Sequence, residues 1–378
     1  MAADGPARGD SEKAEILRGW MRGERVGPYT LEIHPTYRCN LRCTFCKYHT
    51  ARTRNEVDLN QEMPLNRWMS LLDEASSMGV CEVRVCGGGE PLYNRTEAIE
   101  LACRIKEGGM RGSLLTNATL FSRDFARRMV DIGWDEIEVS IDGPDATVHD
   151  RLRGIPGALG RSTDTLRWIL ERKRETAVTL PYVKIYYVVV AQNYHLLPQM
   201  VKYCQEHGVD ELFLLSLCPG GLREDSHRLN AEQAAECLRL VAEAQKVAEG
   251  SSLRFCADFI ENAYGSGDAC GKDSPKEKNA PGGGPHDVLN SPCYDPWTYL
   301  QIHFDGKVGP CCNTYVGEIP EVRSRSLREV WLGSEHLNRI RRSLLNWKFS
   351  GGCRDCGTHH LRDAARIRPL LVKLIGDA

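Results

Sequence analysis

Residues 39–46 read Cys39-Asn40-Leu41-Arg42-Cys43-Thr44-Phe45-Cys46, which places three cysteines in a CxxxCxxC spacing. Three thiols in so short a segment form a set of soft ligands that suits an iron–sulfur cluster or zinc. A structural zinc site usually has four protein ligands, commonly arranged in CxxC pairs. Three cysteines instead leave one iron of a 4Fe–4S cluster without a protein ligand. The segment therefore predicts a cluster with one open iron, and a zinc knuckle or unrelated buried cysteines are the alternatives.

This segment follows the first of six predicted strands, and helical patterns lie between the strands. The predicted strands are Thr30–His34, Glu82–Cys86, Gly112–Thr116, Glu136–Ile141, Val183–Val190 and Glu211–Leu217. Helical patterns occupy residues 65–77, 95–107, 122–132, 158–175 and 194–207, and a further helix is predicted over Ala231–Ala248 with Asn230 as its N-cap. Strands that alternate with helices indicate an α/β fold, a parallel sheet that is either open or curled into a partial barrel. The cysteines would then lie at the carboxyl end of the first strand, where such barrels carry their active sites.

The composition is that of an ordinary globular protein. Its 378 residues are 42% hydrophobic and 26% charged, and 49 basic residues against 51 acidic ones give a net charge of −2. This balance gives no reason to expect nucleic acid or an anionic membrane as a partner. The N-terminus is polar and lacks an apolar core of the signal-peptide type, so a cytoplasmic location is expected. In a reducing compartment, 16 cysteines favour metal ligation over disulfides.

The Cys39–Cys46 segment, with the aromatic Phe45 before its third cysteine, resembles the signature of the radical S-adenosylmethionine (SAM) superfamily. The resemblance implies a partial (β/α)6 barrel. It also implies that the open iron of the 4Fe–4S cluster binds the amino and carboxylate groups of SAM. Reduction of the cluster would cleave SAM to a 5′-deoxyadenosyl radical, which abstracts a hydrogen atom from the substrate. An external one-electron reductant of the flavodoxin or ferredoxin type is an expected partner.

Three later segments resemble further motifs of the same superfamily. Cys86-Gly87-Gly88-Gly89-Glu90-Pro91 resembles the GGE motif, in which glycines allow close approach to a ligand and the carboxylate can pair with an ammonium group. Leu115-Thr116-Asn117 resembles the TNG motif, with Ala118 in place of glycine, and residues 139–144 resemble a fourth-strand motif. The SAM-binding residues implied by the resemblance are Phe45, Gly88, Gly89, Glu90, Pro91, Thr116, Asn117, Ser140, Asp142 and Arg153.

A second group of cysteines lies near the C-terminus. Cys293 precedes Gly306 and the pair Cys311-Cys312, and the motif Cys353-Arg354-Asp355-Cys356 follows. This spacing resembles the SPASM/twitch domain that follows many radical SAM cores, and no cysteine after Cys356 completes a second auxiliary cluster. The smaller, Cys-rich twitch-type domain is therefore expected, with one auxiliary 4Fe–4S cluster on Cys293, Cys311, Cys353 and Cys356. A zinc ribbon on the same thiolates, and Cys312 in place of Cys311, are the alternatives.

These patterns divide the chain into five segments. Residues 1–28 form a tail and a helix, residues 29–220 the radical SAM core, and residues 221–289 a helical connection with a Gly/Pro-rich linker. Residues 290–360 form the SPASM/twitch auxiliary-cluster domain, and residues 361–378 a C-terminal helix.

The resemblance favours a small-molecule substrate. Peptide-modifying relatives commonly carry a peptide-recognition domain before the core, and this chain reaches Cys39 without one. As in twitch-type dehydrogenases and epimerases, the predicted function is hydrogen abstraction from an aminoglycoside, aminocyclitol or sugar, giving oxidation to a ketone or epimerisation. Cys218, at the end of the sixth predicted strand, is the candidate hydrogen-atom donor. The alternatives are modification of a ribosomally made peptide, as by a maturase, and a non-enzymatic zinc-binding protein.

Overall fold

The computed structural model describes residues 7–49, 56–217, 225–265, 288–311, 318–348 and 359–376. Its strands are β1 (Thr30–Ile33), β2 (Glu82–Val85), β3 (Arg111–Thr116), β4 (Glu136–Ser140), β5 (Tyr182–Val189), β6 (Glu211–Ser216), β7 (Arg254–Cys256), β8 (Tyr299–Ile302) and β9 (Val308–Gly309). The first six agree with the predicted strands to within one residue at each end. The last three were not predicted, and β7 and β9, with 3 and 2 residues, are too short to produce a recognisable pattern in the sequence.

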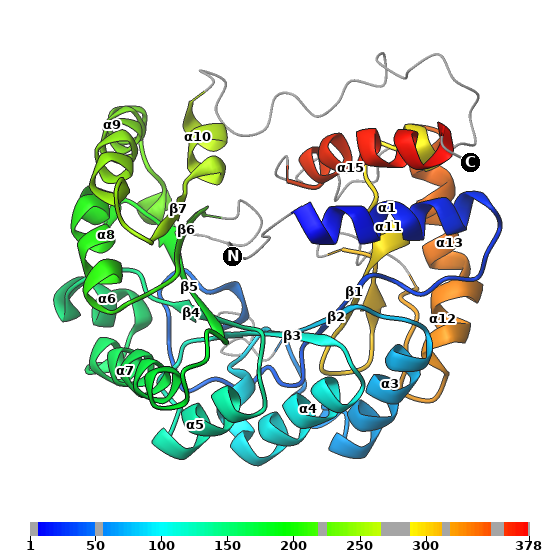
Figure 1. Ribbon diagram of the computed structural model, residues 1–378, viewed down its shortest axis with the longest axis horizontal. Coiled ribbons are helices and arrows are strands. Elements are labelled where there is room, and N and C mark those ends of the chain that lie inside the picture. Colours follow the sequence, from blue (N-terminus) through cyan, green and yellow to red (C-terminus); the bar gives the residue numbers. More distant parts are fainter. Residues whose placement is uncertain are drawn as a thin grey trace.

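These strands form one curved sheet. Its order is β7-β6-β5-β4-β3-β2-β1-β8-β9, and every neighbouring pair is parallel except β8 with β9. Figure 1 shows the sheet as an incomplete ring with helices around its outer side. The predicted α/β fold with a parallel sheet is confirmed.

Helices follow most of the strands. They are α3 (Leu65–Ser77), α4 (Arg95–Glu107), α5 (Arg123–Asp131), α6 (Ala146–Arg153), α7 (Ala158–Thr176), α8 (Leu197–Glu206), α9 (Ala231–Ala248) and α10 (Asp258–Tyr264). The N-terminus of α9 shows why these bounds were predictable. The Asn230 side chain accepts a hydrogen bond from Gln233 N, and the Gln233 side chain accepts one from Asn230 N. This capping box satisfies two backbone donors that the helix itself cannot pair.

The two faces of the sheet differ in polarity. Leu31 and Ile33 of β1, and Val83 and Val85 of β2, belong to the apolar core between the sheet and the helices. Because successive side chains of a strand point to opposite faces, residues such as Glu32 lie on the inner face of the ring. The inside of the ring is therefore polar, and the outside of the sheet is apolar.

The C-terminal region is continuous with this core. Strand β8 extends the sheet beside β1, with Thr30 opposite Tyr299 and Ile33 opposite Ile302. Helix α12 (Leu327–Gly333) contacts α3, and α13 (Glu335–Leu345) contacts both α12 and α11 (Asp295–Thr298). Helix α1 (Ala7–Met21) packs against α11 and α15 (His359–Gly376). The described part of residues 290–360 thus shares the sheet of the core, and the five-segment division stays a prediction.

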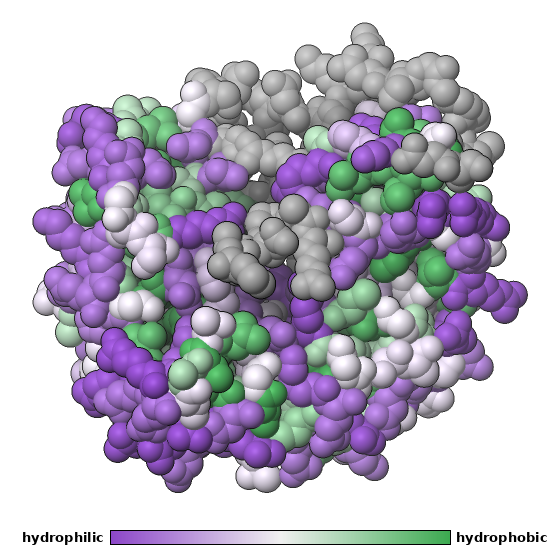
Figure 2. Space-filling view, in the orientation of Figure 1, coloured by the Kyte–Doolittle hydropathy of each residue, from purple (hydrophilic) through white to green (hydrophobic). Residues whose placement is uncertain are grey.

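No helix among the described residues is both long enough and apolar enough to cross a bilayer. Figure 2 shows mostly hydrophilic side chains along the outer helices on the face that is visible. The cytoplasmic location stays a prediction.

Candidate functional site

The three cysteines of the CxxxCxxC segment lie on the loop that follows β1. Leu41 N donates a hydrogen bond to Cys39 Sγ at 3.4 Å, and Arg153 Nη1 lies 3.8 Å from Cys43 Sγ. Hydrogen-bond donors and a positive charge stabilise thiolates, which are the form of cysteine that binds iron. With Cys46, the loop therefore offers a donor set that fits a cluster held by three cysteines.

This cysteine loop is held against the end of α6. Thr44 N donates to Leu152 O at 2.9 Å, and Arg42 N donates to Arg153 O at 3.1 Å. Gly154 ends α6 with a φ of 73°, and a Cβ on it would lie 2.3 Å from Arg42 O. A glycine is needed here both for the left-handed conformation and for the close contact. The loop is thus positioned by α6 as well as by β1.

Gly88 and Gly89 allow the loop after β2 to approach the cysteine loop. A Cβ on Gly88 would lie 2.5 Å from the Tyr37 ring, and one on Gly89 would lie 2.2 Å from Arg38 O. Glu90 N donates to Arg38 O at 2.8 Å. The close approach that these glycines permit is to the protein's own chain, and contact with SAM stays a prediction.

The Glu90 carboxylate joins the loop after β2 to the end of β3. It accepts hydrogen bonds from Thr116 Oγ1 (2.6 Å), Asn117 N (2.8 Å) and Leu92 N (3.1 Å). Burial raises the pKa of Glu90, and these three hydrogen bonds oppose the rise. Pro91 is buried at the start of the short helix Pro91–Asn94. Glu90 therefore organises two loops, and its pairing with the SAM ammonium group stays a prediction.

Asn117 extends this connection to the cysteines. Its Nδ2 donates to Asn40 Oδ1 at 3.1 Å and lies 4.0 Å from Cys39 Sγ. Ala118 has a φ of 59°, a conformation that favours glycine. The backbone here therefore keeps the shape that the glycine of the TNG motif would adopt, although alanine occupies the position.

Asp142 and Arg153 form a buried ion pair beside the cysteines. Asp142 is fully buried, and its Oδ2 lies 2.7 Å from Arg153 Nη2. The Arg153 guanidinium lies 5.7 Å from the centre of the Phe45 ring, and its Nε is buried without a hydrogen-bond partner among the described residues. Burial opposes the charge of Arg153, but Asp142 and Cys43 hold its pKa above the usual value. Arg153 is thus a cation with one donor available to a ligand, and half-buried Ser140 lies at the end of the adjoining strand.

The C-terminal cysteines are only partly described. Cys293 lies just before α11 and Cys311 just after β9, and both are partly buried. Cys353, Cys356 and the candidate hydrogen-atom donor Cys218 lie outside the described residues, as does Cys312. None of the cysteines that the structure does describe forms a disulfide. The ligand set of the auxiliary cluster and the role of Cys218 stay predictions.

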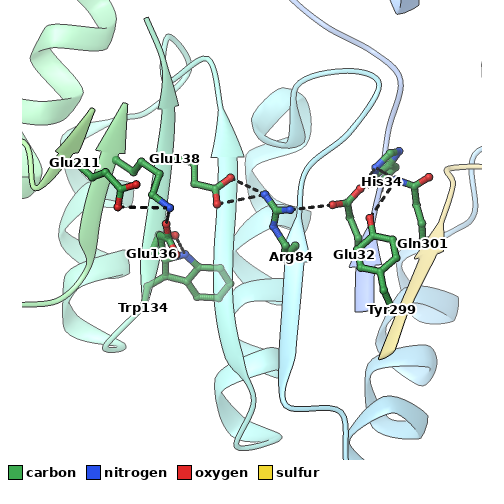
Figure 3. A network of polar contacts seen from close by, with 10 residues as sticks. Glu32, His34, Arg84, Trp134, Glu136, Glu138, Glu211, Tyr299 and Gln301 are labelled. Carbon is green, nitrogen blue, oxygen red and sulfur yellow. Dashed lines mark hydrogen bonds and ion pairs between the residues drawn. The ribbon is translucent and has the colours of Figure 1, made fainter. Parts of the chain in front are cut away.

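Reasoning from the sequence missed a row of charged residues on the inner face of the ring. Arg84 pairs with Glu138 at 2.9 Å and with Glu32 at 3.4 Å, and Lys184 pairs with Glu136 at 2.6 Å. Figure 3 shows this row running across neighbouring strands toward His34 and Gln301. A signal was present, because buried parallel strands are usually continuous apolar runs, whereas here charged and apolar residues alternate.

An open α/β barrel with a three-cysteine loop after its first strand defines a class of protein that holds an iron–sulfur cluster at the mouth of the barrel. Residues 33–204 match the model of the radical SAM superfamily, and residues 293–357 match that of SPASM, an iron–sulfur cluster-binding domain. The protein is therefore a radical SAM enzyme with a C-terminal SPASM domain. The two domains imply a SAM-bound 4Fe–4S cluster and an auxiliary iron–sulfur cluster.

Relatives align with nearly the whole chain. PqqA peptide cyclase from Rhodopseudomonas palustris is 26% identical over 357 residues, which cover 93% of this chain and 85% of the relative. AdoMet-dependent heme synthase from Nitratidesulfovibrio vulgaris is 25% identical over 357 residues, covering 90% and 91%. Streptococcus suis SuiB bound to S-adenosylmethionine superimposes with a TM-score of 0.63 at 18% identity, covering 94% of this chain and 79% of SuiB. This last likeness shows a shared fold.

The predicted aminoglycoside, aminocyclitol or sugar substrate is wrong. The two relatives reported above are a peptide cyclase and a heme synthase, and neither is an aminoglycoside or aminocyclitol dehydrogenase or epimerase. Cysteine spacing determines which clusters can bind, whereas other residues of the barrel select the substrate. Enzymes with the same set of clusters can therefore act on different substrates. The length of chain before Cys39 is likewise no guide to the substrate.

We expect Glu90→Gln to weaken SAM binding about ten- to a hundredfold if the carboxylate pairs with the SAM ammonium group, because such a contact is worth about 1.5–3 kcal/mol. The new amide group would also face the N–H of Leu92 or Asn117, which should destabilise the loop. Glu90→Asp is the matched control, since it keeps the negative charge and shortens the side chain that joins the two loops. Calorimetric titration of the anaerobic, cluster-loaded protein with SAM gives both affinities. Equal weakening in the two variants would indicate a structural role alone.

Proposed function

We propose that this radical SAM enzyme modifies a peptide by closing a ring within it. The observation that carries the proposal is the alignment with PqqA peptide cyclase over 93% of this chain, which includes both cluster-binding domains. When bound, the cluster and SAM supply a 5′-deoxyadenosyl radical that takes a hydrogen atom from the substrate. An external reductant of the flavodoxin or ferredoxin type remains part of the proposal, because SAM cleavage requires an electron.

The charges on the inner face of the ring support a peptide over an acidic tetrapyrrole. The charged side chains of the described row are Glu32, Arg84, Glu136, Glu138, Lys184, Glu211 and Arg254. Four carboxylates against three cations leave one negative charge in excess. Carboxylate groups of a heme precursor would be repelled by this surface, whereas peptide N–H groups and basic side chains can donate to it.

Arg153 and Asp142 would serve the cluster and SAM. The guanidinium lies beside the Cys43 sulfur, so it can offset part of the negative charge of a cysteine-ligated cluster. Its unpaired Nε can donate a hydrogen bond to a carboxylate of a bound ligand. Asp142 pairs with the guanidinium at 2.7 Å and can hold it in this orientation, so we propose a positioning role for Asp142, and its predicted direct contact with SAM stays a prediction.

The experiment uses the anaerobically reconstituted enzyme with SAM, dithionite and a pool of peptides deuterated at carbon. We expect deuterium to appear in 5′-deoxyadenosine, and peptides that have lost two hydrogens to appear in the mass spectrum. PqqA peptide and Fe-coproporphyrin III are added in separate reactions. Deuterium transfer from no peptide, together with turnover of the porphyrin, would reject peptide modification and favour tetrapyrrole chemistry.

A further inference from the structure

The inside of the ring contains a side-chain group in which Glu32 of the charged row meets two residues, His34 and Cys86, that the proposed function has not used. Glu32 lies in β1, His34 directly follows β1, and Cys86 directly follows β2. One oxygen, nitrogen or sulfur atom from each lies within 4.8 Å of the others, and all three residues are buried. Because alternate residues of a strand share a face, Glu32 and His34 both face the interior. The chain then runs five residues from His34 to Cys39, so the group lies at the same end of β1 as the cysteine loop.

Glu32 determines which nitrogen of His34 carries the hydrogen. His34 Nε2 lies 2.9 Å from Glu32 Oε1, and Gln301 Nε2 also donates to that oxygen. Burial favours the neutral acid, but the hydrogen bond from His34 and the Arg84 guanidinium hold the pKa of Glu32 well below its usual range. An ionised carboxylate only accepts hydrogen bonds, so the contact with Glu32 assigns the proton to Nε2. Gln301 Nε2 also lies 3.2 Å from this nitrogen, and in this tautomer it donates to Glu32 and not to His34. Figure 3 shows the His34 ring between Glu32 and Gln301.

The other nitrogen of His34 is then a lone-pair acceptor. Nδ1 is buried and has no hydrogen-bond partner among the described residues. Leaving a buried polar atom unpaired is unfavourable, and such an atom in a functional barrel points to an absent partner. His303 packs edge-on to His34, with ring centres 4.8 Å apart. Burial, and then the neighbouring His34, lower the pKa of His303 to about 3, so His303 stays neutral.

The group fits a proton acceptor better than a metal site. Burial and the nearby Glu32 raise the pKa of Cys86 well above its usual value, so Cys86 remains a neutral thiol. The Arg84 guanidinium, 3.4 Å from Glu32 Oε2, already neutralises the carboxylate that a cation would need. A carboxylate on one imidazole nitrogen with the opposite nitrogen unpaired is instead the arrangement of an oriented general base.

We propose that His34 Nδ1 accepts the proton that the peptide loses when its ring closes, an inference that rests on the proposed function. Ring closure joins two peptide atoms and breaks one bond to hydrogen at each of them. One hydrogen leaves as an atom and forms 5′-deoxyadenosine. The other leaves as a proton, which His34 binds, and its electron passes to a one-electron oxidant of the iron–sulfur class. Glu32 stabilises the resulting imidazolium through its ionised carboxylate.

The test separates the loss of the first hydrogen from the loss of the second. His34→Ala and His34→Gln are compared with the unmodified enzyme in single turnovers with SAM, dithionite and the deuterated peptide pool. Deuterium transfer to 5′-deoxyadenosine should stay near the unmodified level, because it precedes the proposed step. Peptides lacking two hydrogens should form about 10²–10⁴-fold more slowly, the range over which general bases act. Added imidazole should restore part of this rate in His34→Ala.

His207→Ala is the matched control, since that ring stacks on Tyr203 at the end of α8, outside the sheet. It should leave both rates unchanged. Unimpaired ring closure in both His34 variants would overturn the proposal, as would an equal loss of deuterium transfer and ring closure. Absence of deuterium transfer in the unmodified enzyme would instead reject the proposed function itself, and the role of His34 with it.

Neutron diffraction from anaerobic crystals provides a readout that does not depend on turnover. We expect a hydrogen on His34 Nε2, directed at Glu32, and none on Nδ1. A hydrogen on Nδ1 in the resting enzyme would contradict the proposal, because a nitrogen that already carries a proton cannot accept another.

Discussion

Replacing Cys39, Cys43 and Cys46 together by alanine should abolish SAM cleavage and remove about half of the iron from the reconstituted protein. On the two-cluster model the unmodified protein carries about eight irons, of which the CxxxCxxC loop binds about four. Cleavage should be lost completely, because the three thiols lie on one loop and the described site offers no substitute ligand set beside them. Iron and labile-sulfide analysis, with chromatographic assay of 5′-deoxyadenosine, measures both effects.

Cys103→Ala/Cys204→Ala is the matched control for this variant. These cysteines lie in α4 and α8, on the helices around the sheet, and should bind no cluster. The control should therefore keep its full iron content and its SAM cleavage. SAM cleavage that survives in the triple variant would contradict the radical SAM assignment of the loop.

The sequence predicted the core of the fold well, because local patterns and the sheet agree there. The amphipathic pattern of α3 and the capping residues of α9 define those helices without reference to distant residues. Strand β8 was missed for the opposite reason. Its four residues become a strand only through pairing with β1, which lies far away in the sequence.

The sequence predicted the cysteine ligands of the site but not the contacts that hold them in place. The cysteine spacing is visible in the sequence, and so are the glycines after β2. Why residue 89 must be a glycine is visible only in the folded protein. A Cβ at this position would lie 2.2 Å from Arg38 O, which belongs to another loop. The pairing of Glu32 with His34 was missed because each residue alone is an ordinary polar side chain. Their role as a pair becomes visible only when both are known to lie on the inner face of the sheet.

Asp142→Ala should lower the free energy of unfolding by about 3–5 kcal/mol, because it leaves the Arg153 guanidinium buried without its carboxylate. The pair lies in the interior, where Asp142 is fully buried and Arg153 is 7% exposed. Asp142 Oδ1 also accepts a hydrogen bond from Val188 N at 3.0 Å, and this backbone donor would lose its partner. Urea unfolding followed by circular dichroism measures the loss.

Arg153→Met and the double variant Asp142→Ala/Arg153→Met complete the comparison. Arg153→Met leaves a buried carboxylate without its cation and should also be strongly destabilising. The double variant removes both charges, so its loss of stability should be smaller than the sum of the two single losses by about 0.5–3 kcal/mol. Strict additivity would show that the two side chains are not coupled.

The same variants separate the structural role of the pair from its role beside the cluster. Removing the Arg153 charge next to Cys43 should make the SAM cluster harder to reduce, since a nearby cation stabilises the more negative, reduced state. Arg153→Lys keeps that charge, so its reduction potential should lie close to that of the unmodified protein. Its free energy of unfolding should recover less, because lysine lacks the planar guanidinium that pairs with Asp142. A redox titration followed by electron paramagnetic resonance gives the potential. An unchanged reduction potential in Arg153→Met would show that Arg153 only holds the cysteine loop against α6 and has no electrostatic effect on the cluster.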